Sequence, residues 1–301
     1  MKIGMIGLGR MGMNMARRLL EQGQAVTAYN RTPEKTRQLA ELGAEACFSL
    51  EELVQALEPP RILWMMLPAG EIVDRHLDKI LGLAGPGDVV IDGGNTYYKD
   101  DIRRSQTAAE KKVQYLDVGT SGGIWGLQAG YCLMVGGAKE AFDRVEPVLA
   151  ALAPKEGYLY CGPTGAGHFV KMIHNGIEYG MMQAYAEGFG ILEDSAYADN
   201  LDYARLSHLW NQGSVIRSWL LELAELAFAK SPKLDDLLGS VQDSGEGRWT
   251  VQQAVETASS APVLTLALME RFRSRRENTF PDRVLAALRR EFGGHAVQKS
   301  E

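Results

Sequence analysis

The fold is decided by residues 2–32, KIGMIGLGRMGMNMARRLLEQGQAVTAYNRT. A short apolar segment, Ile3–Ile6, runs directly into a glycine-rich turn at residues 7–12. Apolar residues at helical spacing follow, and beyond Gly23 a second apolar segment, Val26–Tyr29, is typical of a strand. Strand, tight turn, helix and strand in this order predict the first βαβ unit of a dinucleotide-binding fold.

The turn itself, Gly7-Leu8-Gly9-Arg10-Met11-Gly12, has the spacing GxGxxG. We expect Gly7 to form the turn, Gly9 to let the backbone approach a pyrophosphate, and Gly12 to let helix and strand pack closely. The helix that begins here presents N–H groups and its positive dipole end to phosphates. A purely structural turn is the alternative, but the flanking strands and helix favour cofactor contacts along residues 7–12.

The end of the second strand normally separates NAD from NADP, because an acidic residue there binds the ribose 2′-hydroxyl and repels a 2′-phosphate. This chain has Asn30, Arg31 and Thr32 instead. An amide, a guanidinium and a hydroxyl together suit a phosphate. We therefore predict NADP, with NAD as the alternative if Arg31 is an ordinary surface residue.

Further apolar segments recur at the spacing of an α/β protein and predict a doubly wound, mostly parallel sheet of the Rossmann type. They are residues 62–67, 89–92, 113–118, 131–135 and 158–161. Ligands of such sheets bind beyond the carboxyl ends of the strands. Two small, polar, glycine-rich loops are therefore candidate binding segments, Asp92-Gly93-Gly94-Asn95 and Gly119-Thr120-Ser121-Gly122-Gly123.

After residues 162–167, GPTGAG, the pattern changes to helical, which predicts domains at 1–163 and 164–301. The second domain is expected to be all-α, with a long central helix at about residues 168–194. Shorter helices are expected at residues 201–211, 215–229, 249–260, 263–276 and 281–291.

The long helix carries a short polar group, Lys171, His174, Asn175 and Glu178, within an otherwise apolar segment. At 100° per residue these four side chains lie on one face. A solvated stripe should continue as polar residues, yet the same face runs on into Met182 and other apolar side chains. The pattern favours one wall of a cleft, with a solvated face as the alternative.

Composition excludes several classes of protein. The 301 residues carry a net charge of −6, which gives no general attraction for nucleic acid. Three scattered cysteines argue against a disulfide framework or a zinc site and for reduced thiols in the cytoplasm. We expect no membrane span, because no apolar run approaches the roughly 20 residues that one needs. We also expect no catalytic metal.

The segments GLGRMG, NRT, DGGNTYY, GTSGGIWGLQAGYCLMVGG and GAGHFVKMIHNGIEYG make the chain resemble the short-chain form of the decarboxylating 6-phosphogluconate dehydrogenases. The wider β-hydroxyacid dehydrogenase superfamily shares the first segment but lacks HFVKMIHNGIEYG. The resemblance implies oxidative decarboxylation of 6-phosphogluconate to ribulose 5-phosphate, with reduction of NADP.

The resemblance also implies roles for individual residues. Lys171 would be the general base and Glu178 the general acid, while Asn95 would touch both nicotinamide and substrate. The remaining substrate contacts that it implies are Ser121, Gly122, Gly123, His174, Asn175, Tyr179 and Arg273, the last two at the phosphate. In this family the tail of one subunit completes the other's site, which implies a homodimer with Arg289 and His295 in that role.

The segment Asp243–Thr250 differs from the longer family members, so the resemblance assigns no phosphate contact to Ser244 or Glu246. Ile124 and Trp125 replace an acidic pair of the longer enzymes. The basic cluster at residues 271–276 is either a solvated surface or a site that captures an anionic substrate.

The proposed base must be partly neutral near pH 7, so desolvation must lower the pKa of Lys171 from about 10.4 by two or three units. Two other activities stay open from the sequence. One is a β-hydroxyacid dehydrogenase for a small unphosphorylated acid, and the other is a non-catalytic NADP-binding sensor.

Overall fold

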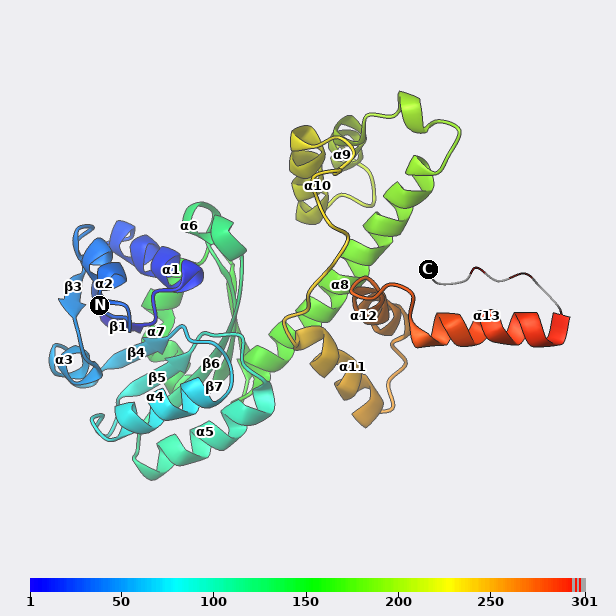
Figure 1. Ribbon diagram of the computed structural model, residues 1–301. Helices are drawn as coiled ribbons and strands as arrows, with labels where there is room; N and C mark the ends of the chain where they lie inside the picture. Colours follow the sequence, from blue (N-terminus) through cyan, green and yellow to red (C-terminus); the bar gives the residue numbers. More distant parts are fainter. Residues whose placement is uncertain (294–295, 297, 299–301) are drawn as a thin grey trace. The chain divides into compact units, whose positions relative to one another are not determined.

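The computed structural model describes residues 1–293, 296 and 298. These residues fall into two compact units, unit 1 at Met1–His174 and unit 2 at Asn175–Glu301. Helix α8 (Ala166–Glu193) is continuous, beginning in unit 1 and ending in unit 2 (Figure 1). It corresponds to the long helix predicted from the sequence.

Unit 1 is built on one eight-stranded sheet with the order β3-β2-β1-β4-β5-β6-β7-β8. All neighbouring strands are parallel except β6 and β7. The strands are β1 (Lys2–Ile6), β2 (Ala25–Tyr29), β3 (Glu45–Cys47), β4 (Ile62–Met65), β5 (Val89–Asp92), β6 (Gln114–Ser121), β7 (Cys132–Gly137) and β8 (Tyr158–Gly162). The predicted mostly parallel sheet is confirmed, although the short strand β3 was not predicted.

Helices cover both faces of this sheet, because successive strand residues point to opposite sides. In β4, Ile62 and Trp64 pack in one apolar core with residues of α1 and α7, while Leu63 and Met65 pack in a second core with residues of α3 and α4. The helices of unit 1 are α1 (Arg10–Glu21), α2 (Pro33–Ala40), α3 (Leu50–Gln55), α4 (Glu71–Leu81), α5 (Tyr98–Glu110), η1 (Gly123–Trp125), α6 (Gly126–Ala129) and α7 (Lys139–Leu152). The doubly wound architecture is therefore confirmed.

One row of paired residues crosses the sheet and marks its carboxyl edge. The row consists of Tyr29, Ile6, Met65, Asp92, Asp117, Gly136 and Gly162, from β2 to β8. The strands β2, β1, β4 and β5 end at this row, whereas β6 continues to Ser121. The segments that follow the first four strands therefore share one edge with the last part of β6.

The pairing of β6 with β7 corrects one expectation from the sequence. Residues 119–121 were expected in a loop, but Gly119, Thr120 and Ser121 pair with Met134, Leu133 and Cys132 of β7. The antiparallel partner supplies backbone hydrogen bonds that a local pattern does not reveal. The loop begins only at Gly122, which has φ +129°.

Unit 2 is all-helical over its described residues, as predicted. Phe189 of α8 packs against Tyr203, Trp210 and Phe228, at ring-centroid distances of 5.9, 5.6 and 4.8 Å. A second small core joins Tyr179 of α8 to Ala267 and Leu268. The helices after α8 are η2 (Ala198–Asn200), α9 (Tyr203–Asn211), α10 (Trp219–Lys230), α11 (Glu246–Glu256), α12 (Pro262–Arg273) and α13 (Phe280–Gly293).

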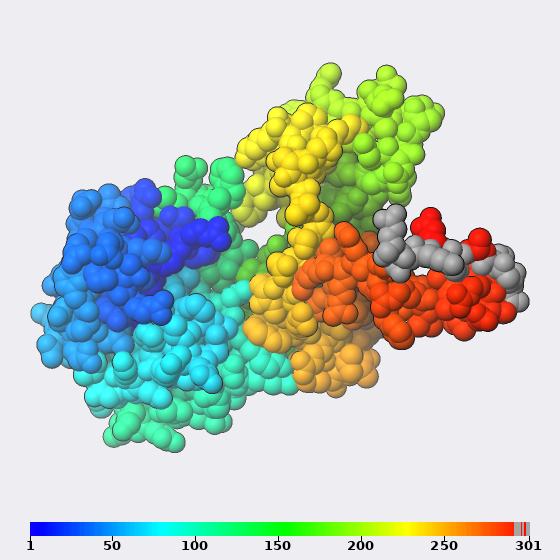
Figure 2. All heavy atoms as spheres, in the orientation of Figure 1, coloured from blue at the N-terminus to red at the C-terminus, as the bar shows by residue number. Residues whose placement is uncertain are grey.

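Within unit 2, Figure 2 shows the yellow atoms of α10 and the orange atoms of α12 gathered in different places. Over the described residues, none of the helices has the length and apolar character to cross a membrane.

Candidate active site

In the glycine turn between β1 and α1, backbone packing requires Gly7 and Gly12 but does not require Gly9. Gly7 has φ +94°, and its N–H donates to the carbonyl of Tyr29 at 2.9 Å. A Cβ on Gly12 would lie 2.1 Å from the Gly7 carbonyl oxygen, so only glycine fits. A Cβ on Gly9, in contrast, would meet no atom within 4 Å. Packing does not explain Gly9, but the approach of a ligand to this backbone would.

Asn30 ties this turn to the end of β2. Its Oδ1 accepts a hydrogen bond from the Leu8 N–H at 2.8 Å, and its Nδ2 donates to the Thr32 carbonyl at 3.0 Å. The side chain of Asn30 therefore shapes the turn, while Arg31 and Thr32 are exposed beside it. No acidic residue occupies positions 30–32.

The loop after β5 is held by the last residue of that strand. Asp92 is fully buried, and its carboxylate accepts hydrogen bonds from Gly94 N–H at 3.0 Å and from the Thr96 hydroxyl at 2.8 Å. A Cβ on Gly93 would lie 2.1 Å from Trp64 Nε1. Asn95 stands exposed between the two anchored residues, just beyond the carboxyl edge of the sheet.

The first turns of α8 lie across β6. Asp117 accepts hydrogen bonds from the N–H groups of Gly165 and His168 at 2.7 and 2.9 Å, which satisfies donors at the start of the helix. Further along, a Cβ on Gly119 would lie 2.3 Å from the Cβ of Lys171. α8 therefore runs along β6 away from the sheet row, and Lys171 lies at the same edge as the glycine turn and the Asn95 loop.

Lys171 is only 7 % exposed, and its Nζ lies 3.4 Å from Nδ1 of His174. Asn175 is also buried, while His174 and Glu178 are half-buried. The polar group on α8 is thus not a solvated stripe. Ser121 and Gly122 are half-buried at the end of β6, and Gly123 is exposed.

Unit 2 holds a second set of polar contacts around Asn175 and Tyr179. The Asn175 amide donates to Glu246 at 2.6 Å, and the Ser244 hydroxyl donates to the other oxygen of the same carboxylate. Tyr179 Oη accepts from the Ser244 N–H at 3.2 Å. Sequence patterns assign no role to Ser244 or Glu246, because their partners lie about seventy residues away along the chain.

The structure places Arg271 against Tyr179, while Arg273, predicted to contact the substrate phosphate, lies elsewhere on α12. The Arg271 guanidinium lies 3.6 Å from the centre of the Tyr179 ring. Arg273 is two positions further on α12, about 200° around the helix, and it pairs with Glu270 at 2.7 Å with a side chain 72 % exposed. The cluster of arginines in the sequence does not show which of them faces α8.

Of the two predicted tail residues, Arg289 is exposed on α13, and His295 lies outside the described residues.

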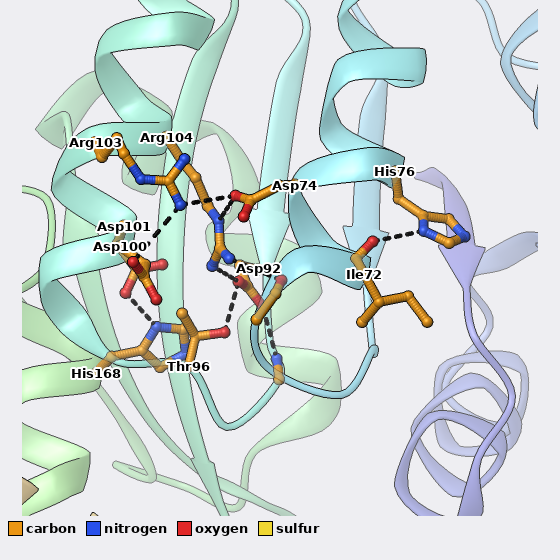
Figure 3. Close-up of polar contacts among 12 residues, drawn as sticks. Ile72, Asp74, His76, Asp92, Thr96, Asp100, Asp101, Arg103, Arg104 and His168 are labelled. Carbon is orange, nitrogen blue, oxygen red and sulfur yellow. Dashed lines mark hydrogen bonds and ion pairs between the residues drawn. The ribbon is translucent and has the colours of Figure 1, made fainter.

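A buried network of polar and charged side chains, which the sequence did not reveal, joins α5, β5, β6 and α8 in unit 1. Figure 3 shows its members Asp92, Asp101, Arg104 and His168. We call it the His168 network; its members are Asp92, Asp101, Arg104, Tyr115, Asp117 and His168. His168 Nδ1 lies 2.7 Å from Asp101, and Arg104 donates to Asp74 at 2.7 Å. Burial raises the pKa of Asp101 to about 6, against the lowering effect of His168.

Asp101, Asp117 and His168 place ligand-type atoms within 4.8 Å of one another. These atoms already serve protein hydrogen bonds, since Asp117 caps α8 and Asp101 accepts from His168 and from Tyr115 at 2.8 Å. The carboxylate oxygens and Nδ1 are therefore already engaged within the protein, while His168 Nε2 has no hydrogen-bond partner among the described residues.

Comparisons with known proteins agree over both units. A family model described as the NAD binding domain of 6-phosphogluconate dehydrogenase matches residues 2–162, and one for the C-terminal domain of the same enzyme matches residues 167–300. YqeC of Bacillus subtilis is 48 % identical over 299 residues, covering 99 % of this chain and all of that protein.

A Haloferax volcanii protein named as an NAD(+)-dependent, decarboxylating 6-phosphogluconate dehydrogenase is 42 % identical, with both chains fully covered. Among solved structures, 6-phosphogluconate dehydrogenase of Plasmodium falciparum matches with a TM-score of 0.83 and 32 % identity, over all of this chain and 67 % of that one. A Mycobacterium tuberculosis 3-hydroxyisobutyrate dehydrogenase matches with a TM-score of 0.71 and 26 % identity, over 88 % and 90 % of the two chains.

Proposed function

Because this chain belongs to the 6-phosphogluconate dehydrogenase family, we propose that it oxidises and decarboxylates 6-phosphogluconate to ribulose 5-phosphate. The main structural support for this proposal is the arrangement of three candidate segments in unit 1. The glycine turn, the Asn95 loop and the buried Lys171 share the carboxyl edge of one sheet. A dinucleotide on the turn therefore has both a polar loop and a buried amine at its edge of the sheet.

The residues of the glycine turn fit a dinucleotide, since Gly9 leaves open space where a pyrophosphate needs close approach. The bound cofactor supplies the hydride acceptor. Lys171 accepts the proton of the substrate hydroxyl as hydride leaves the same carbon. Its burial supports this role, because desolvation favours the neutral amine.

Loss of CO₂ from the resulting 3-keto acid leaves an electron pair that the ketone accepts. The protonated Lys171 then donates to the enolate oxygen to give an enol. Glu178 protonates C1 as Lys171 takes the enol O–H proton back, which leaves the ketone of the product. The two side chains are seven residues apart on α8, a rise of about 10 Å along a helix axis. They lie on one helix face, which supports their acting on neighbouring carbons of one substrate.

We further propose that Asn175, Tyr179 and Arg271 contact the substrate in unit 2, with Arg271 at the phosphate. The carboxylate of Glu246 cannot donate a hydrogen bond, so it fixes the amide of Asn175 with its NH₂ toward Glu246. The guanidinium of Arg271 lies over the Tyr179 ring, so a cation and a phenol hydroxyl lie close together. Such a pair suits a phosphate ester.

The preferred cofactor is proposed to be NADP. The exposed Arg31 and Thr32 and the lack of a carboxylate at positions 30–32 support it. NAD is the alternative, because the Haloferax volcanii relative is named NAD(+)-dependent.

A homodimer is also proposed. Unit 2 carries a largely apolar cavity of about 1000 Å³ lined by residues of α8 and α10 among others. Phe280, Leu285 and Leu288 of α13 are 56–69 % exposed. Apolar surface of this kind supports association with a second chain.

Steady-state assays with 6-phosphogluconate and either NADP or NAD test this function. We expect cofactor reduction together with stoichiometric release of CO₂, and a larger kcat/KM with NADP. Reduction with 3-hydroxyisobutyrate but not with 6-phosphogluconate would instead make this chain a dehydrogenase for small unphosphorylated acids. Cofactor binding without turnover of either acid would support the sensor.

A further inference from the structure

His168 is tied to the same helix turn that carries Lys171. Its N–H donates to Asp117, and its ring contacts Asp101, so both its backbone and its side chain are held. His168 precedes Lys171 by three residues, which places the two side chains on neighbouring positions of one helix face. A shift of His168 therefore moves Lys171.

The same network holds the loop that carries Asn95. Asp92 anchors Gly94 and Thr96 on either side of Asn95. The Tyr115 hydroxyl connects the two parts of the network, since it donates to Asp101 at 2.8 Å and lies 3.4 Å from Asp92. A continuous chain of polar contacts thus runs from the Asn95 loop to the Lys171 turn.

Stability alone does not explain why charged groups occupy these positions. Asp92, Asp101, Arg104, Asp117 and His168 are all at most 2 % exposed. Buried ion pairs are often no more stable than apolar residues of the same volume, but they fix geometry through directional hydrogen bonds. The placement of the network between two catalytic segments agrees with such a geometric role.

We propose that His168 and Asp101 form a positioning pair, which fixes Lys171 relative to Asn95 through the His168 network. The inference rests on the proposed function of Lys171 and Asn95 and adds to it a pair of residues that themselves touch neither substrate nor cofactor. The decisive contact is the one from His168 Nδ1 to Asp101, because His168 Nε2 has no hydrogen-bond partner among the described residues.

Two substitutions of His168 separate this contact from simple packing. His168→Asn keeps a donor close to the position of Nδ1, whereas His168→Leu fills similar space without a donor. Leu149→Ala serves as a control for stability, because Leu149 of α7 is fully buried in an apolar core and is not part of the network.

In the full chain we expect His168→Leu to lower kcat at least tenfold, with the Kd for NADPH within twofold of wild type. His168→Asn should stay within about threefold in kcat. Leu149→Ala should lower the melting temperature without changing kcat per folded molecule. Equal losses of kcat in the Asn and Leu variants, or a kcat unchanged in the Leu variant, would overturn the proposal.

Hydrogen exchange gives a second readout that needs no turnover. In the NADPH complex, His168→Leu should increase amide exchange in both residues 93–97 and residues 166–172, while His168→Asn leaves both near wild type. Faster exchange in the helix alone would show that His168 does not hold the Asn95 loop. A wild-type chain without activity would refute the proposed function. The exchange rates of the two His168 variants would still show whether His168 couples the Asn95 loop to the Lys171 turn.

Discussion

Lys171 is fixed by its neighbours before any substrate binds. Gly119 leaves room for its Cβ, and His174 Nδ1 lies 3.4 Å from its Nζ. A glycine is needed at position 119 because a Cβ there would lie 2.3 Å from the lysine Cβ. The packing of α8 closely against β6 at Gly119 therefore also buries the side chain of Lys171.

Lys171→Ala should reduce kcat by about 10²–10⁴-fold, the usual contribution of a general base. NADPH should still bind, since the glycine turn is untouched. Lys155→Ala, at an exposed lysine in the loop before β8, is the matched control and should keep full activity. Initial rates and fluorescence titration with NADPH measure both effects, and near-normal turnover of the Lys171 variant would remove its assignment as base.

Arg271 and Arg273 offer a direct comparison on one helix. Arg271→Ala should raise KM for 6-phosphogluconate by about 10–100-fold, because a hydrogen bond to a charged group contributes about 1.5–3 kcal/mol. Arg273→Ala should change KM less than twofold, since its side chain is 72 % exposed. The opposite order of KM values would return the phosphate contact to Arg273.

The β1 to α1 junction separates glycines needed by the fold from a glycine available to a ligand. Gly9→Ala should leave the melting temperature within a degree or two, because its Cβ would meet no atom within 4 Å. It should nevertheless raise the Kd for the dinucleotide about tenfold, by crowding the pyrophosphate. Gly12→Ala should instead destabilise the fold, because its Cβ would lie 2.1 Å from the Gly7 carbonyl oxygen.

Thermal unfolding and NADPH titration of the two glycine variants test this distinction. A Gly9→Ala chain that binds the dinucleotide as tightly as wild type would place the pyrophosphate elsewhere.

The contact between α5 and α8 makes stability depend on pH. Burial would lower the pKa of His168, but Asp101, Asp92 and Asp117 raise it to about 10. A histidine whose folded pKa lies above its unfolded value of about 6.5 stabilises the protein fully below that value, and the contribution is lost as pH rises toward 10. Asp101, with its pKa raised to about 6, also loses its contribution as pH rises, but in the lower range between about pH 4 and pH 6.

The free energy of unfolding should therefore fall between pH 7 and pH 9 by roughly 2–3 kcal/mol through His168. His168→Asn should lack this part of the slope, because asparagine does not titrate. Urea unfolding of both proteins at pH 7 and pH 9 measures the difference, and equal slopes would show that His168 is neutral in the folded chain.

Assembly is a property of the whole molecule. We expect sedimentation to give twice the chain mass of 33.0 kDa. Leu285→Glu with Leu288→Glu should weaken the dimer at least tenfold, because these exposed apolar side chains of α13 would be buried by a second chain. The matched control is Arg283→Glu on the same helix, which changes charge without removing apolar surface. A monomeric wild type at micromolar concentration would refute the dimer.

The sequence was sufficient to predict the order of elements and the class of each unit. The turn at Gly7–Gly12, the strands and the long helix through Lys171 are encoded in local patterns: a glycine spacing, short continuous apolar runs and a period of 3.6. The strand β3 was not predicted, because its three residues, Glu45–Cys47, are too few to form a recognisable strand pattern. The candidate residues Asn95 and Lys171 were found because each follows or lies within such a local pattern.

Contacts between distant segments were decided only by the tertiary structure. The antiparallel pairing of β7 with β6 brings the start of α8 onto Asp117, which the separate strand patterns do not reveal. The same packing joins Asp101 to His168 and turns Arg271 rather than Arg273 toward Tyr179. Local propensity determines what a segment becomes, whereas the partner of a buried charge depends on which faces meet when the apolar cores close.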